Sequence, residues 1–382
     1  MPSTVWRSLP LRFIYLGLAY LVISSFLGIL GLFGYYFKPV HSHLMLAGFV
    51  SMTIIGSMYQ LVPTVTGTEL RLRGIAEVSF YLTNLGVLML AASFRGLIPF
   101  YISGSVYVLG ILAFAAVVLV TLTDMKLRSV AVPFFVLAVI LYLAGTVYGI
   151  LGLAGKVDFR IAVHNHLLTA GWIGVTTFGG LYELFPMLAL RKLKSVKLAY
   201  FTFILLLISL PLMLYGFQKS SDVFVTLGGA GYALAFILLS SNLLLTLAGK
   251  SETPAPLDIS VKFFVPALLF GITGVLAGLL YSDKFIHAHL MLVGWITLTV
   301  MGAEYHIIPM ITWMEKYSER LGIEDVPMIG DLFNMKLAEI LLVMSVLGTT
   351  LLLIPVTRVA GGILLFGTFL AFTWDMIMVQ RR

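Results

Sequence analysis

A segment of 23 residues occurs three times in this chain. It reads HSHLMLAGFVSMTIIGSMYQLVP from His41, HNHLLTAGWIGVTTFGGLYELFP from His164 and HAHLMLVGWITLTVMGAEYHIIP from His287. The offset is 123 residues both times, with no gap inside the segment, and eight columns are identical in all three copies. All seven histidines of the chain lie in it, six of them as a His-x-His pair at the start of each copy. Such a repeat predicts three copies of one structural unit that carry the same side chains in the same place.

The hydropathy of the chain indicates whether the repeated unit belongs to a soluble protein or to a membrane protein. Of the 382 residues, 60% are hydrophobic and 11% are charged, whereas a soluble domain carries about a quarter charged residues. Apolar runs of about twenty residues or more recur, each long enough to cross a bilayer as a helix. We predict an all-α, polytopic membrane protein with twelve transmembrane helices in three pseudo-symmetric four-helix repeats. The predicted spans are about 11–37, 41–63, 76–95, 98–122, 129–153, 160–187, 195–217, 221–249, 260–281, 285–311, 333–355 and 357–379.

The basic residues predict how the chain is oriented. We expect a single integral membrane domain, 1–382, with internal repeats at about 1–126, 127–250 and 251–382. With the N-terminus inside, the inner loops and tails carry 17 of the 24 lysines and arginines. Because basic loops stay on the cytoplasmic side, both termini are expected in the cytoplasm of a multi-pass protein of the cell (plasma) membrane. The net charge of +7 then belongs to these loops, and we expect contact with membrane lipid and none with nucleic acid.

The motif histidines are candidate metal ligands. Residues i and i+2 of an α-helix point about 200° apart, so one helix offers one imidazole to each of two neighbours. Three such helices around a pseudo-threefold axis make three sites with two histidines each. Zinc and copper centres take three or four protein ligands, whereas haem takes two axial ones, so the pattern favours bis-histidine haem near the outer face. The candidate ligands are His41, His43, His164, His166, His287 and His289.

Three further groups of residues have both a functional and a structural interpretation. A glycine column makes room for a flat macrocycle or for a close helix crossing; it consists of Gly48, Gly171 and Gly294. Basic residues just before each pair either bind haem propionates or lie at the membrane interface; they are Lys38, Arg160 and Lys284. Polar residues at the inner end of the motif serve proton uptake or a quinone headgroup, or are simple interfacial residues; they are Glu183, Glu304 and His306.

The three segments resemble those of the catalytic subunit of the haem–copper oxygen reductases and their nitric oxide reductase relatives. That family has twelve helices in three pseudo-symmetric groups of four. HAHLMLVGWITLTVMGAEYHIIP is most similar to helix 10 of the C-type oxidases, on which a His-x-His serves two haems. The resemblance implies that His287 corresponds to the high-spin haem ligand, and that His289 and His41 correspond to the two low-spin haem ligands.

The chain departs from that family at the copper site. The family holds its copper, or non-haem iron, with one histidine of helix 6 and two adjacent histidines of helix 7. The seventh predicted helix here, KLAYFTFILLLISLPLMLYGFQ, has no histidine, so copper is not expected. Rotating the implied pairing of His289 with His41 about the threefold axis predicts two equivalent pairs. These are His43–His164 and His166–His287.

These observations predict a membrane protein that carries up to three b-type haems and transfers electrons. The chain has no cysteine, which excludes thiolate metal sites, iron–sulfur clusters and covalent c-type haem. Expected partners are a quinone or an extracytoplasmic cytochrome or other redox protein, with companion membrane subunits. One alternative is a terminal reductase of oxygen, nitric oxide or superoxide with one open haem site. Another is a haem or metal transporter, so whether the protein is an enzyme stays open.

Overall fold

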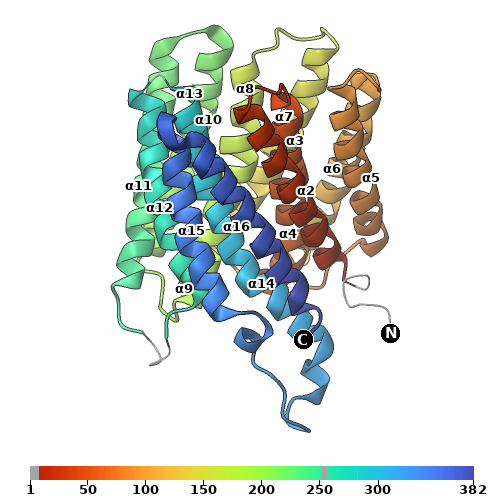
Figure 1. The fold of residues 1–382 in the computed structure, drawn as a ribbon, viewed down its shortest axis with the longest axis vertical. Helices are drawn as coiled ribbons and strands as arrows, with labels where there is room; N and C mark the ends of the chain where they lie inside the picture. Colours follow the sequence, from red (N-terminus) through yellow and green to blue (C-terminus); the bar gives the residue numbers. More distant parts are fainter. Residues whose placement is uncertain (1–7, 252–255, 282) are drawn as a thin grey trace.

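The chain folds into a bundle of long helices (Figure 1). The computed structural model describes residues 8–251, 256–281 and 283–382. Within these ranges there is no β-strand, and eleven helices are long and apolar enough to cross a membrane. The predicted all-α, polytopic class is therefore confirmed. The division into three repeats stays a prediction, and parts of its first and third units, 1–7, 252–255 and 282, lie outside the described residues.

The helices follow one another with short connections. The first repeat comprises α2 (Leu9–Leu32), α3 (Lys38–His43), η1 (Leu44–Val50), α4 (Ser51–Thr66), α5 (Arg73–Ser93) and α6 (Phe100–Thr123). The second comprises α7 (Ala131–Leu153), α8 (Ile161–His166), η2 (Leu167–Gly174), α9 (Val175–Leu188), α10 (Val196–Lys219) and α11 (Asp222–Leu247). The third comprises α12 (Ile259–Leu280), α13 (Lys284–His289), η3 (Leu290–Thr297), α14 (Leu298–Lys316), η4 (Ser318–Arg320), η5 (Ile329–Leu332), α15 (Met335–Leu353), η6 (Pro355–Thr357) and α16 (Arg358–Val379).

The three motif segments are continuous helices and form the interior of the bundle. Two of them, Lys38–Thr66 and Lys284–Lys316, have 72% and 56% of their most apolar stretch buried, against 33% to 44% in the other nine spans. The remaining motif helix runs from Ile161 to Leu188. It corresponds to the sixth predicted span, 160–187, which is not among the eleven. Its histidines, threonines and glycines make it less apolar, which suits a helix that faces protein instead of lipid.

The first helix ends earlier than its apolar run. The run extends to about residue 37, but α2 ends at Leu32. Gly34 has a φ of +92°, a left-handed conformation that glycine adopts without steric cost. The backbone N–H of Tyr35 then donates to the carbonyl of Leu30 at 3.0 Å, which closes the helix. Hydropathy alone does not mark this turn, because the residues beyond it are still apolar.

The third and fourth helices of each repeat form a tight antiparallel pair. A Cβ added to Gly86 of α5 would lie 2.6 Å from the Cα of Tyr107 on α6. One added to Gly228 of α11 would lie 2.3 Å from the backbone nitrogen of Met213 on α10, and Gly361 is equally crowded between α16 and α15. Such contacts are possible only without a side chain, as at close helix crossings in membranes. These three hairpins lie outside the motif helices.

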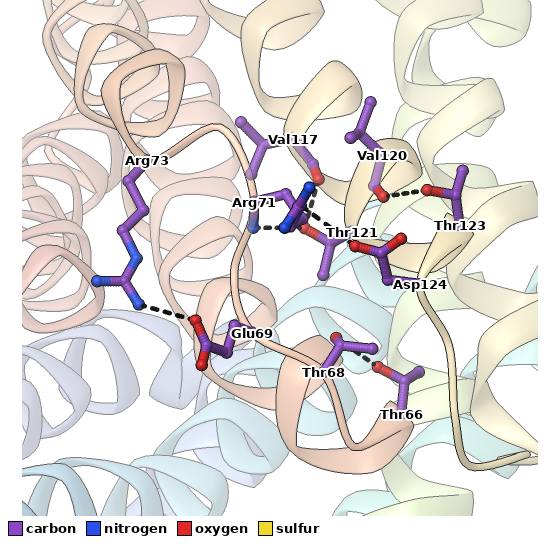
Figure 2. Close-up of polar contacts among 10 residues, drawn as sticks. All are labelled: Thr66, Thr68, Glu69, Arg71, Arg73, Val117, Val120, Thr121, Thr123 and Asp124. Carbon is purple, nitrogen blue, oxygen red and sulfur yellow. Dashed lines mark hydrogen bonds and ion pairs between the residues drawn. The ribbon is translucent and has the colours of Figure 1, made fainter.

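At the end of the bundle that carries both termini, the α4–α5 connection is tied to the end of α6 (Figure 2). The backbone N–H of Arg71 donates to Oγ1 of Thr121 at 3.2 Å, and its Nε lies 3.2 Å from the carboxylate of Asp124. The second repeat has the same type of bond, from the backbone N–H of Lys194 to Oγ1 of Thr246 at 2.9 Å. These bonds hold two helix ends in place.

Candidate functional site

All six motif histidines lie at the opposite end of the bundle from the termini, on α3, α8 and α13 (Figure 1). Each pair occupies the fourth and sixth positions of a six-residue α-helix, and every ring is partly buried. We call these six residues the histidine cluster. Short segments of regular α-helix therefore set the angle between the two rings of each pair, as the sequence predicted.

The second histidine of each pair bonds to its own helix. Nδ1 of His43, His166 and His289 lies 2.8 Å from a backbone carbonyl oxygen four residues earlier in each case. The acceptors are Pro39, Ala162 and Phe285. A carbonyl can only accept, so Nδ1 carries the hydrogen and Nε2 is left with a free lone pair. This is the tautomer that binds a metal through Nε2.

The first histidine of each pair reaches to the preceding long helix. Nδ1 of His41, His164 and His287 lies 2.8, 3.2 and 2.8 Å from a backbone carbonyl oxygen of α2, α7 and α12. The acceptors are Ser24, Gly145 and Gly274. The same argument leaves Nε2 free, so all six rings offer one metal-binding nitrogen. A hydrogen bond from the other ring nitrogen to a carbonyl orients a ligating histidine and raises its basicity.

Three glycines that the sequence analysis did not single out make room for the first histidines. A Cβ added to Gly28, Gly149 or Gly278 would lie 2.9, 2.7 or 2.6 Å from Cε1 of the histidine ring beside it. These glycines are 121 and 129 residues apart, so the 123-residue offset did not reveal them. Each of these glycines lies on the long helix that precedes the motif. Only the contact between that helix and the histidine identifies them.

The structure brings the histidines of different repeats together. His43 lies close enough to His164 for their charges to interact, as His166 does to His287 and His41 to His289. These are the pairs that the resemblance and the threefold repeat together imply, and shared ligation of one iron by each pair stays a prediction. Among the described residues, no three histidines, aspartates or glutamates gather as a metal-binding group. The donor sets therefore suit a cofactor that needs two protein ligands.

Each histidine pair is followed by a π-helical segment, η1, η2 or η3, where the sequence predicted regular α-helix. Side-chain hydroxyls match the wider turn in two copies. Ser51 donates to the carbonyl of Leu46 at 2.7 Å and Thr297 donates to that of Leu292 at 2.8 Å, in both cases five residues earlier. π-Helical turns are rare and frequently occur at functional sites. Here they rotate the histidine pair relative to the α-helical segment that follows, α4, α9 or α14.

The motif glycines pack against the preceding helix. A Cβ at Gly48 would lie 2.7 Å from Cγ of Tyr20, and one at Gly294 would lie 2.7 Å from Cβ of Phe270. Gly171 faces Leu141 at 3.1 Å in the same manner. A close helix crossing accounts for the missing side chains, and contact of these glycines with a cofactor stays a prediction.

Basic residues surround the histidine end of the bundle. The three predicted before the pairs are exposed, and one of them, Arg160, forms an ion pair with Asp158 at 3.0 Å. Arg358 is a further basic residue at this end. Its guanidinium carbon lies 4.0 Å from the ring centre of Phe285, and its charge interacts with His289. Its position at the start of α16 was not visible in the motif, because α16 is the last helix of the chain.

Comparisons with known proteins support the fold. No protein-family model matches the chain. An uncharacterised protein of Aquifex aeolicus (strain VF5) is 27% identical to it over 290 residues, which are 72% of this chain and 71% of that protein. The chain also resembles a cryo-EM structure of a haem–copper terminal oxidase dimer, with a TM-score of 0.74 and 16% identity over 100% of this chain and 85% of that one. At this identity the likeness shows a shared fold.

Proposed function

We propose that the protein is a membrane oxidoreductase component in which three pairs of histidines each bind one b-type haem for electron transfer. The pairs are His289–His41, His43–His164 and His166–His287. The observation that carries this proposal is the shared state of the six rings. Each donates its Nδ1 hydrogen to a backbone carbonyl and keeps Nε2 free.

The residues present fit this cofactor in number and chemistry. Two neutral imidazoles complete the coordination of a haem iron, which then has no open position and exchanges one electron at a time. The glycines beside the first histidines keep these rings from being pushed out of place. Arg358 and the exposed Lys38, Arg160 and Lys284 supply cations for propionates at this end of the bundle.

The position of the cluster restricts the electron path. All three pairs lie at one end of the bundle, so electrons that pass among them do not cross the membrane. We infer that the donor or acceptor is an extracytoplasmic redox protein, and that a quinone or a companion subunit serves the other side. This assumes the cell membrane and cytoplasmic termini, for which the excess of basic residues in the inner loops is the support.

The test is the haem content of the purified chain, measured as pyridine haemochrome against amino-acid analysis. We expect three b haems per chain, and two in each of His43→Leu, His166→Leu and His289→Leu. His306→Leu is the matched control, since it removes the one histidine outside the His-x-His pairs and should keep all three. A chain without haem, or variants that lose none, would refute the proposal.

The spectrum of the reduced protein with carbon monoxide adds a second readout. Six-coordinate haems should show no change. A shift in one third of the absorbance would mean that one haem has an open position. The protein would then be a terminal reductase. The fold that it shares with a terminal oxidase is compatible with that function.

A further inference from the structure

A small cavity lies between the inner halves of the three motif helices α4, α9 and α14. Its volume is about 80 Å³, room for several water molecules. The walls come largely from equivalent positions of the three copies. Two such columns are Thr53/Thr176/Thr299 and Met58/Leu181/Glu304. The cavity therefore lies on the pseudo-threefold axis that relates the motif helices, with one carboxyl group in its wall.

Glu304 is the charged residue of this wall, and the protein leaves it without a partner. Its side chain is 0% exposed, and neither carboxyl oxygen has a hydrogen bond within the part of the chain that the structure describes. Thr53 also lines the cavity and interacts with this carboxyl group, but its Oγ1 forms no bond of acceptable geometry either. A buried, unpaired carboxylate is among the most unfavourable groups that a protein can hold.

Two of the hydroxyl groups in the cavity wall already donate to the backbone. Thr176 donates its hydroxyl hydrogen to the carbonyl of Trp172 at 2.7 Å, and Thr299 donates to that of Trp295 at 2.8 Å. These two oxygens therefore present only lone pairs to the cavity. An ionised carboxylate finds no donor in either of them, and Oγ1 of Thr53 has no hydrogen-bond partner among the described residues. A carboxylic acid can itself donate to these oxygens, directly or through water.

The helices packed around Glu304 bring little other charge. Among the described residues, Tyr15 of α2 is the titratable group that interacts with Glu304 electrostatically. Its hydroxyl already donates to the carbonyl of Met376. Asp375 of α16 accepts from Tyr305 at 3.4 Å instead. The cavity residues of α4, α7, α9 and α12 are uncharged. Nothing in the site neutralises the carboxylate except a proton or a bound cation.

We propose that Glu304 and this cavity form a proton-binding site that holds the carboxylic acid and binds its proton more tightly when electrons enter the histidine cluster. The second part rests on the proposed function. The step is proton transfer to the fraction of Glu304 that is still ionised. An O–H bond of a hydronium ion in the water of the inner side breaks, and the O–H bond of the carboxylic acid forms. The electron comes from a quinol or a one-electron donor protein that reduces a haem.

The distance along the helix between Glu304 and the histidines determines how strongly reduction of a haem changes the proton affinity of Glu304. Glu304 is 15 residues from His289, or about 20 Å along the helix. It lies between the three motif helices, so an electron on any histidine pair acts from a similar distance. At an effective dielectric constant of about 20, one charge at that distance changes the proton affinity roughly fourfold. Three electrons together change it roughly sixtyfold.

Infrared difference spectroscopy of the full chain tests both parts. First, the static spectrum of the wild type minus Glu304→Gln should show the carbonyl stretch of a protonated carboxyl group at neutral pH. This measurement works whatever the haem content. Glu183→Gln is the matched control, because Glu183 accepts a hydrogen bond from Ser129 at 2.7 Å and lies outside the cavity. It should leave the carboxyl band in place.

Two results would overturn the inference. Carboxylate bands alone, or bands that change when sodium or potassium is exchanged for a large organic cation, would make the cavity a cation site. A carboxyl band whose amplitude and frequency stay the same after dithionite reduction of a haem-loaded chain would remove the redox link. A chain that binds no haem but shows the static band would refute the proposed function and keep the proton site.

Discussion

The glycines beside the first histidines allow a graded test of the ligand geometry. Alanine at Gly278 would place its Cβ 2.6 Å from Cε1 of His287, whereas ordinary contact begins at 3.4 Å. The ring would have to move by about 0.8 Å, which would lengthen its 2.8 Å bond to Gly274 to roughly 3.6 Å and so break it. Loss of such an orienting bond typically lowers metal affinity about 10- to 100-fold.

The assay is haem retention by the purified chain under dilution, followed in the Soret band and by pyridine haemochrome. We expect Gly278→Ala to lose one haem of three. Gly28→Ala should have a smaller effect, because its Cβ would lie 2.9 Å from His41 and needs a shift of only about 0.5 Å to reach 3.4 Å. Gly31→Ala, on the same helix and with no described atom within 4 Å, is the control. Equal haem retention in all three variants would refute the reasoning.

Three other substitutions separate packing from cofactor binding. Gly48→Ala brings a Cβ within 2.7 Å of Tyr20, so we expect about 1–3 kcal/mol of lost stability, seen as a lower melting temperature in detergent with unchanged haem per folded chain. Ser51→Ala removes the acceptor of the indole N–H of Trp172, bonded at 2.9 Å, and should cost about 1–3 kcal/mol in the same assay. Arg358→Gln removes a cation beside one site and should lower the midpoint potential of one haem, as redox titration would show; equal shifts in all three haems would contradict this placement.

Several features were predictable from the sequence because they depend on local properties. A run of about twenty apolar residues has few stable states other than a membrane helix, so the helical bundle followed from hydropathy. The fixed offset of 123 residues placed the His-x-His pairs at equivalent positions. The 200° separation within a pair, with three equivalent helices, led to three sites between helices. The resemblance implied which histidines share each site, and in the structure these histidines are close enough to interact electrostatically.

Other features depend on how the helices cross. The carbonyl acceptors of the first histidines, and the glycines that face them, lie on other helices at offsets that differ between copies. No pattern along the chain records which turn of one helix meets which turn of the next. The π-helical turns also depend on tertiary structure. Hydroxyl hydrogen bonds and packing around the glycine column stabilise them.

Glu304 shows the difference most clearly. In the sequence it lies near the inner end of the third motif copy, as Glu183 does in the second copy. An interfacial carboxylate costs little there. The structure separates the two residues: Glu183 is half-buried and bonded to Ser129, whereas Glu304 is fully buried and unpaired in the described part of the chain. The sequence by itself determined an all-helical membrane protein with three histidine pairs at one end. Only the tertiary structure decided which polar groups the bundle encloses, because burial depends on the neighbours that packing supplies.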